Sequence, residues 1–188
     1  GESESDTLTE IDVAFGNGGD DRIRLSNGGT LTVGSFSFQF GNLAFGNGGN
    51  DDIATADGLD VIFGGKGEDT ISTGKGSQLT IGSGSSQFRL ALGDLIFGGD
   101  DNDTIDSDDP AGDRADDDID FVFGGAGNDT INGYGGGDIS IGDVSNPDFE
   151  LKLGNLIFGG TGEDTITTLD GIDVIFGEEE NDNISTAK

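Results

Sequence analysis

A nine-residue unit that recurs seven times without an internal gap is the strongest restriction on how this chain can fold. Each copy starts with Phe-Gly, has Asp at its seventh position and ends with Ile. The copies span residues 15–23, 45–53, 63–71, 97–105, 123–131, 158–166 and 176–184. Such self-similarity indicates stacked structural repeats, because one short unit cannot bury its own apolar side chains and needs a neighbour on each side.

The composition excludes several classes of function. The chain has 188 residues, with 38 acidic and 8 basic side chains and no His or Cys. It therefore lacks a Ser-His or Cys-His catalytic pair, an ordinary zinc site and any disulfide. The remaining reactive groups, among them Tyr134, form no recognisable catalytic constellation, so we expect no enzyme. A net charge of −30 repels nucleic acid, and no apolar run approaches the ~20 residues of a membrane helix. We therefore expect neither nucleic-acid binding nor membrane insertion.

The high negative net charge indicates that a folded chain needs a counter-ion. With only 31% hydrophobic residues, the chain is either a solvated acidic tail or a fold whose carboxylates are neutralised. The invariant Phe and Ile around each acidic loop favour the fold. Hard carboxylate oxygens favour Ca²⁺ as the neutralising ion, and a Cys-free, Gly-rich acidic chain suits the calcium-rich space outside a cell. We therefore predict a secreted protein, extracellular or at the cell surface.

The unit resembles the RTX, or haemolysin-type, calcium-binding nonapeptide G-G-x-G-x-D-x-(apolar)-x. The sequence GGAGNDTIN at residues 124–132 matches this pattern throughout. The resemblance implies an all-β fold, a parallel β-roll or β-solenoid, with calcium held between loops on successive coils. We expect one domain over residues 1–188, with about seven coils.

The Asp and Gly residues of the loops explain in physical terms why such a fold would bind calcium. One carboxylate per loop falls at a fixed register, and stacked carboxylates at the ~4.8 Å strand spacing repel one another unless a cation lies between them. Seven loops enclose six gaps, so we predict about six Ca²⁺ ions. The predicted carboxylate ligands are Asp21, Asp51, Asp69, Asp103, Asp129, Asp164 and Asp182. Glycines let successive backbones approach closely, so that their carbonyls reach one ion. The predicted carbonyl ligands are Gly16, Gly19, Gly46, Gly49, Gly64, Gly67, Gly98, Gly124, Gly127, Gly159 and Gly162.

The spacing between the copies predicts insertions on the far side of the roll. Successive phenylalanines of the unit are 30, 18, 34, 26, 35 and 18 residues apart. Long and short coils therefore alternate, and the three longest alternate apolar and polar residues around a Gly/Ser turn, which predicts β-hairpins. The residues before each loop are apolar on both strand faces, so one face fills the core and the other forms a phenylalanine column. We expect the hairpins to cover this column; the alternative is that part of it packs against a neighbouring subunit.

Two further sets of positions are less regular. On the opposite edge, Asp60, Asp94, Asp120 and Asp173 share a register and predict a second, partial calcium column. On the main edge, the loops at 97–105 and 176–184 replace glycine with Asp101 or with glutamates. These substitutions add carboxylates and remove conformational freedom, so the occupancy of the sites there stays open or their geometry is altered.

The chain starts and stops part-way through a short coil, and joining tail to head would make one nearly normal coil. This favours a secreted structural repeat protein whose identical subunits stack end to end through calcium loops and open strand edges into a filament, surface layer or matrix. The alternative is a calcium-dependent folding or secretion module of a larger RTX toxin, adhesin or extracellular enzyme. A remote alternative is an ice-binding solenoid, but only Thr165 and Thr167 form a T-x-T pair on the first strand.

Overall fold

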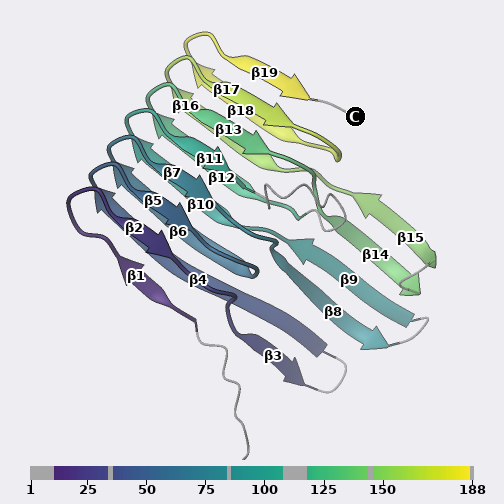
Figure 1. Cartoon of the computed structure of the whole chain (residues 1–188). Coiled ribbons are helices and arrows are strands. Elements are labelled where there is room, and N and C mark those ends of the chain that lie inside the picture. The colour runs from purple at the N-terminus through teal and green to yellow at the C-terminus, as the bar shows by residue number, and fades with distance from the viewer. Residues whose placement is uncertain (1–10, 34–35, 84–85, 108–117, 144–145, 187–188) are drawn as a thin grey trace, which may run out of the picture.

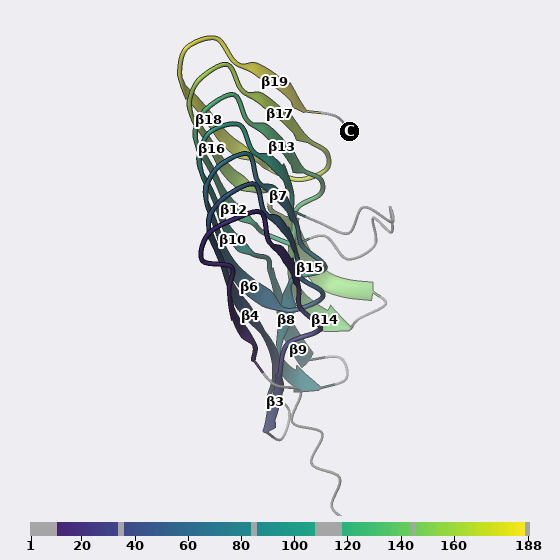
Figure 2. The same cartoon turned by 60° about the vertical axis from the view of Figure 1, so that its left-hand side comes forward.

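The computed structural model describes residues 11–33, 36–83, 86–107, 118–143 and 146–186. All regular elements within these ranges are β-strands, nineteen in number, and they form two sheets (Figure 1). The chain winds through the two sheets alternately, so that each turn lies beside the turn before it (Figure 2). The predicted all-β parallel roll is confirmed.

One sheet contains the strand that leaves each nonapeptide loop. Its seven parallel strands carry the last residue of each unit, and Ile23, Ile53, Ile71, Ile105, Ile131, Ile166 and Ile184 pair in register. The strands are β2 (Arg22–Arg24), β5 (Asp52–Ala54), β7 (Thr70–Ser72), β11 (Thr104–Asp106), β13 (Thr130–Gly133), β17 (Thr165–Thr168) and β19 (Asn183–Thr186).

The other sheet contains the strand that enters each loop. The seven phenylalanines that start the units pair in register across it. These strands are β1 (Val13–Phe15), β4 (Phe36–Gly48), β6 (Leu59–Lys66), β10 (Leu95–Asp100), β12 (Phe121–Ala126), β16 (Leu156–Thr161) and β18 (Val174–Glu179). Because each strand occurs at the same register in its coil, every nonapeptide loop lies at the same edge of the roll (Figure 1).

A narrow core fills the space between the sheets. It consists of one isoleucine column from the first sheet and a column from the second. The buried members are Ile23, Ala44, Ile53, Ile62, Ile71, Ile96, Ile105, Val122, Ile131, Ile157 and Ile166. Fully burying a side chain of this size stabilises the fold by ~1.5–3 kcal/mol. The core is one residue wide on each side, so its stability accumulates from rung to rung.

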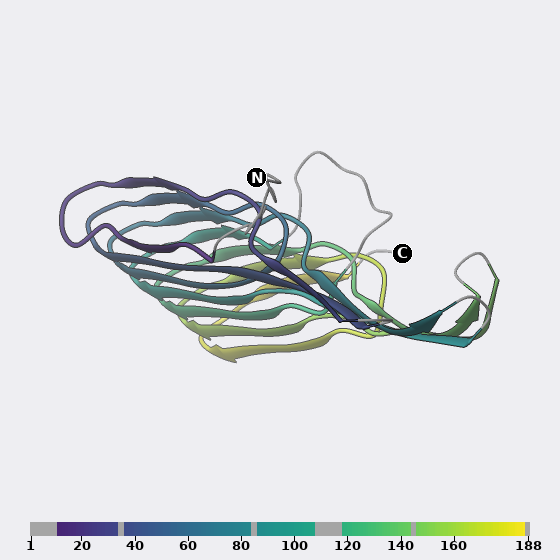
Figure 3. The same cartoon turned by 90° about the horizontal axis from the view of Figure 1, so that it is seen from below.

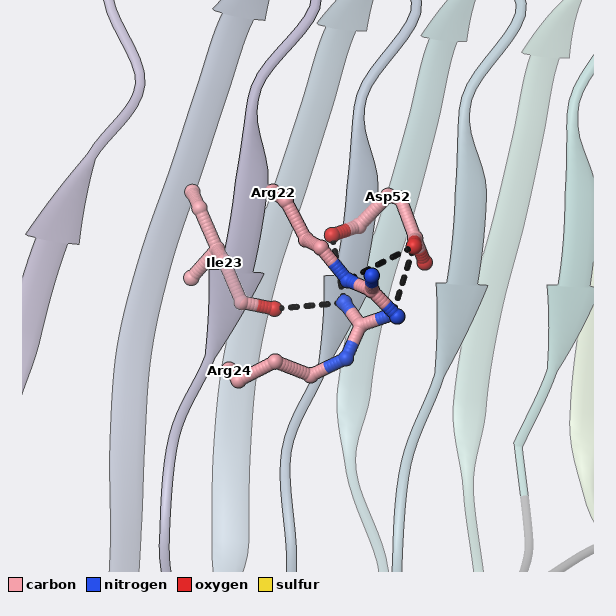
Figure 4. Close-up of polar contacts among 4 residues, drawn as sticks. All are labelled: Arg22, Ile23, Arg24 and Asp52. Carbon is pink, nitrogen blue, oxygen red and sulfur yellow. Dashed lines mark hydrogen bonds and ion pairs between the residues drawn. The ribbon is translucent and has the colours of Figure 1, made fainter.

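The outer face of the seven-stranded sheet is polar. Thr70, Thr104, Thr130 and Thr165 lie in register on it and are exposed. At the N-terminal end of this sheet two arginine side chains lie beside an aspartate (Figure 4). Arg22 Nε lies 3.4 Å from Asp52 Oδ2, and Arg24 donates to the same oxygen and to the carbonyl of Asp52. Exposed ion pairs of this kind contribute ~0–1 kcal/mol, so they relieve local repulsion and do little more.

The three longest coils carry the predicted hairpins. The first joins β3 (Thr30–Val33) to the start of β4, the second joins β8 (Ser77–Ser83) to β9 (Ser86–Leu92), and the third joins β14 (Asp138–Asp143) to β15 (Asn146–Lys152). The hairpins also pair with one another, β4 with β8 and β9 with β14. They form an antiparallel layer, in the order β3-β4-β8-β9-β14-β15, that projects beyond the roll on the side away from the nonapeptide loops (Figure 3).

The prediction that the hairpins cover the phenylalanine column is wrong. The rings of the column stack with centroids 4.8–5.1 Å apart, and the end members Phe15 and Phe176 are 60% and 47% exposed. In the first hairpin the physical reason lies at Gly41 and Asn42, where β4 shifts register against β6 and continues without reversing. The Asn42 amide donates to the Asp60 carboxylate of the next coil, so these residues extend the sheet and cannot form a turn.

Candidate calcium-binding loops

All seven nonapeptide loops have the same backbone conformation. The third and fifth residues of each loop have positive φ, with values of 76–79° at non-glycine residues and 102–132° at glycines. Glycine is the natural residue there, because a Cβ strains this region of φ. At the fifth position stacking is also close: a Cβ on Gly49, Gly67, Gly127 or Gly162 would lie within 2.5 Å of a carbonyl oxygen in the preceding coil. The loops therefore stack with carbonyls facing the neighbouring coil.

The two irregular loops keep this conformation. Asp101 has φ 76°, Glu178 79° and Glu180 76°, at a cost of ~1–3 kcal/mol each for a non-glycine residue. Their carboxylates also find partners: the Gly67 amide donates to Asp101 Oδ2 at 3.3 Å and the Gly162 amide donates to Glu180 Oε2 at 2.9 Å. The substitutions therefore leave the backbone conformation of these loops unchanged, and the geometry and occupancy of the calcium sites there stay a prediction.

The seven aspartates form a continuous column. In each pair of adjacent loops, the backbone amide of one Asp donates to Oδ1 of the next, at 2.8 Å in five gaps and 3.1 Å in the last. The column joins Asp21, Asp51, Asp69, Asp103, Asp129, Asp164 and Asp182. The structure thus brings together all the aspartates that the sequence singled out on this edge.

In six of these seven aspartates the second carboxylate oxygen is buried and has no hydrogen-bond partner. Buried, unpartnered Oδ2 atoms belong to Asp21, Asp51, Asp69, Asp103, Asp129 and Asp164. Each faces a cradle formed with the next coil. A Cβ on the second loop residue would lie within 3.0 Å of this Oδ2 and of the carbonyl oxygen of the equivalent glycine in the next loop. The glycines are Gly16, Gly46, Gly64, Gly98, Gly124 and Gly159. Two oxygens therefore face the same small space without a donor between them.

This donor set fits calcium. A buried carboxylate oxygen with neither donor nor cation is costly, and Ca²⁺ takes 6–8 oxygen ligands, backbone carbonyls included. Within the described ranges, no three or more acidic, His or Cys side chains converge so that they could hold a metal ion by themselves. That agrees with a site in which each loop gives one carboxylate and backbone carbonyls supply the remaining ligands.

The electrostatics of the column point the same way. Burial raises the pKa of Asp69 and Asp129 to about 6 and that of Asp103 to about 8. These pKa values already include two smaller effects. The backbone amide that donates to each carboxylate lowers its pKa by less than burial raises it, and the neighbouring carboxylates of the column contribute a smaller increase. A proton is therefore the alternative to a cation at each of these positions.

We expect the metal-free chain to be more stable in acid than at neutral pH. The folded pKa values lie above the ~3.9 of an unfolded Asp, so the folded state binds more protons between about pH 4 and pH 8. The free energy of unfolding consequently falls as the pH rises through that window. Circular dichroism of calcium-stripped protein should show β structure near pH 4.5 that is lost by pH 8. High salt at pH 8 is the control for general charge repulsion, and greater stability at pH 8 than at pH 4.5 would contradict the prediction.

A second column beside the aspartates was missed by sequence reasoning. The sixth loop residue varies among Asp, Asn and Glu, but its side-chain oxygen recurs as an acceptor. Asp20, Asn50, Asn102 and Asn128 accept hydrogen bonds from backbone amides of neighbouring coils at 2.7–3.2 Å. Asp and Asn share an acceptor oxygen in the same place, and this shared chemistry was the signal available in the sequence.

The opposite edge carries a mixed column of acids and amides. Asp12 donates from its amide to Asn42, and the same bond repeats through Asp60, Asp94, Asp120, Asn155 and Asp173. Hydroxyl groups satisfy two of the second oxygens: Ser107 donates to Asp120 and Thr168 to Asp173. Oδ2 of Asp60 and of Asp94 is buried and accepts no hydrogen bond of regular geometry. Burial has the largest effect on the pKa of these two carboxyls and raises the pKa of Asp60 to about 6, although the hydroxyls of Thr55 and Thr73 lie close enough to lower both pKa values.

This second column therefore differs from the first. Asn42 and Asn155 use their amide nitrogens to donate to backbone carbonyls, which a metal-ligating carboxylate does not do. The positions predicted as a second calcium column are brought together by the fold. All four carboxylates have a neighbouring Ser or Thr hydroxyl, and calcium binding at all four stays a prediction.

The comparisons with known proteins agree with these loops. The family model of the RTX calcium-binding nonapeptide repeat matches the chain in four copies, at residues 5–29, 45–77, 114–146 and 155–187. Together these matches cover more than half of the chain. Neither the curated proteins nor the solved structures contain a match. No helix among the described residues has the length and apolarity needed to cross a membrane.

Proposed function

Because the chain belongs to the RTX calcium-binding nonapeptide-repeat family, we propose that it is a secreted structural protein whose copies stack head to tail when calcium fills its loops. The observation that carries the calcium part is the set of buried aspartate Oδ2 atoms without a partner. About six ions, one in each gap, would supply the missing partners, and their twelve positive charges would reduce the net charge from −30 to −18.

The end rungs support stacking between subunits. At the N-terminal end of the described chain the core residue Ala14 is only partly buried, and at the other end Ile184 is 45% exposed although its counterparts in the inner rungs are buried. The two ends of the aspartate column also complement each other, because one end offers a backbone amide and the other a carboxylate oxygen. The Asp182 amide has no further carboxylate among the described residues, and Asp21 Oδ1 receives no such bond. A second copy can thus continue both the core and the column, and a contact of this heterologous type forms an open fibre.

Electron microscopy of the purified chain tests this proposal. In about 10 mM Ca²⁺, well above the ~10⁻⁴–10⁻³ M expected for extracellular sites, we expect filaments that disappear in chelator. Ile184→Lys should prevent filaments while the subunit still folds in calcium, because the lysine lies where the next core would stack. Asn183→Lys, at the exposed neighbouring position, is the matched control and should still give filaments. Particles no longer than one roll in calcium would contradict head-to-tail assembly.

The second candidate is a calcium-dependent folding or secretion module of a larger secreted protein. The same observation favours it, since further coils of the same chain would cover the exposed end rungs as well as another copy does. The two candidates differ in one result. Calcium-dependent folding without filaments supports the module, whereas filaments that require Ile184 support the assembling subunit.

A further inference from the structure

The outer face of the twelve-stranded sheet is apolar over the roll and over the hairpins without interruption. On β4 the register shift places Phe40 opposite Leu59 and Leu43 opposite Val61. Leu59 and Val61 are two residues apart on one strand and therefore share a face. Phe40 and Leu43 consequently share that face too, and the phenylalanine column continues directly into the hairpin layer.

The pairing of the hairpins carries this face across all of them. Residues that lie opposite each other in antiparallel strands place their side chains on the same face. One column joins Phe36, Ile81, Phe88, Ile141 and Phe149. A second joins Leu79, Leu90, Ile139 and Leu151. The opposite face of the same strands is polar and joins Thr80, Arg89, Ser140 and Glu150.

We propose that this apolar face is the docking surface for a second copy of the chain, so that two rolls pair face to face. The hairpin layer is a single sheet that extends beyond the roll (Figure 3). One of its faces is apolar, and stable sheets bury such a face against another layer. Within the described ranges no segment covers it, and six of its side chains are 37–50% exposed. These are Leu31, Phe40, Ile81, Ile141, Phe149 and Leu151.

The available area is sufficient for a stable pair. On the roll, five more side chains of this face are 40–60% exposed, namely Val13, Phe15, Phe121, Val174 and Phe176. A fully buried aromatic side chain contributes ~150–250 Å². The eleven exposed side chains together can therefore bury about 1,000 Å² per copy, which exceeds the ~800 Å² per partner of a standard protein interface.

The geometry and the charge also favour a second copy as the occupant. The ring spacing of 4.8–5.1 Å is constant along the column, and a second copy brings the same spacing, so that side chains interdigitate along the whole face. A two-fold axis makes such a contact self-complementary and closed. None of the columns that form the face contains a charged residue, so the repulsion between two acidic copies comes from other surfaces and is screened by salt over ~8–10 Å.

The test is sedimentation velocity of the full chain in calcium, in the Ile184→Lys background that blocks end-to-end contact. We expect a dimer of twice 19.2 kDa at about 10 μM protein, and tighter pairing in about 0.5 M NaCl because screening removes repulsion. Phe149→Lys and, separately, Ile81→Lys should raise the dissociation constant at least 100-fold. Glu150→Lys inserts the same side chain on the polar face of the same strand and should leave the dimer intact. Circular dichroism in calcium confirms that each variant folds.

Three results would overturn the proposal. The first is a monomer at every concentration in a background that folds, and the second is equal weakening by Phe149→Lys and Glu150→Lys. The third is co-sedimentation of monomers with phosphatidylcholine vesicles, which would make a lipid surface the occupant. The pairing does not depend on head-to-tail stacking, since the Ile184→Lys background removes the latter, so failure of one leaves the other standing.

Discussion

Removing calcium at pH 7.5 should abolish the β structure of this chain. At about 10 mM calcium, a site with a dissociation constant of ~10⁻⁴–10⁻³ M stabilises the folded state by about 1.4–2.7 kcal/mol. Six occupied gaps then contribute about 8–16 kcal/mol, which is comparable to the ~5–15 kcal/mol by which an ordinary domain is stable. Without the ions, the column of Asp21 to Asp182 places a carboxylate at every rung with only a proton to neutralise it.

Far-ultraviolet circular dichroism during a titration with chelator measures this effect. The strand signal should disappear and return when calcium is added back in excess. Magnesium at the same concentration is the control, because Mg²⁺ demands tight octahedral geometry and keeps its waters, which a cradle of carbonyls and one carboxylate does not suit. Strand content that is equal in chelator and in calcium would show that the column is satisfied without a cation.

A methyl group at Gly124 should disrupt the centre of the roll. Its Cβ would lie less than 3.0 Å from both Asp129 Oδ2 and the carbonyl oxygen of Gly159. It would therefore occupy the cradle between the fifth and sixth loops. We expect Gly124→Ala to cost about 3 kcal/mol or more, the upper end of the range for overpacked sites, and to remove at least one bound ion. Because each coil contacts only its neighbours, this substitution also weakens the contact between the coils before and after it.

Isothermal titration calorimetry and thermal unfolding in calcium check this result. Ala126→Val, two residues further along the same loop at an exposed position, adds more volume outside the cradle and should leave both the number of ions and the melting temperature unchanged. If Gly124→Ala binds as many ions as the wild type with the same stability, the cradle is not the binding site.

The parallel register was predictable because it follows from residues that repeat. The Phe and Ile of each unit occur at fixed positions, and a one-residue slip would expose every isoleucine. The Asp column followed for the same reason. The column at the sixth loop residue was missed because its members differ in charge: some are acidic, and others, such as Asn50 and Asn128, are neutral. Their side chains nevertheless present the same acceptor oxygen. The sequence did not reveal that the loops at 97–105 and 176–184 keep the common backbone conformation without glycine. Asp101 and Glu180 adopt positive φ there, and their carboxylates accept hydrogen bonds.

The direction of the hairpins could not be read from the sequence. Their alternating pattern fixes which side chains share a face, but that face is apolar whether the hairpin folds back or continues outward. In the first hairpin the direction depends on two residues, Gly41 and Asn42, whose backbone either reverses or extends. It also rests on pairing between hairpins that are far apart in the chain, such as Phe88 with Ile141, which no local pattern reveals.

The constant ring spacing has a consequence for how the chain tolerates change in length. Coils that differ from 18 to 35 residues all advance by the same 4.8–5.1 Å along the phenylalanine column. The extra residues of a long coil leave the roll sideways, so pitch and coil length are uncoupled. Segments grafted between the hairpin strands would therefore change the surface of the protein but not the spacing of the coils, because the backbone of the roll alone fixes that spacing.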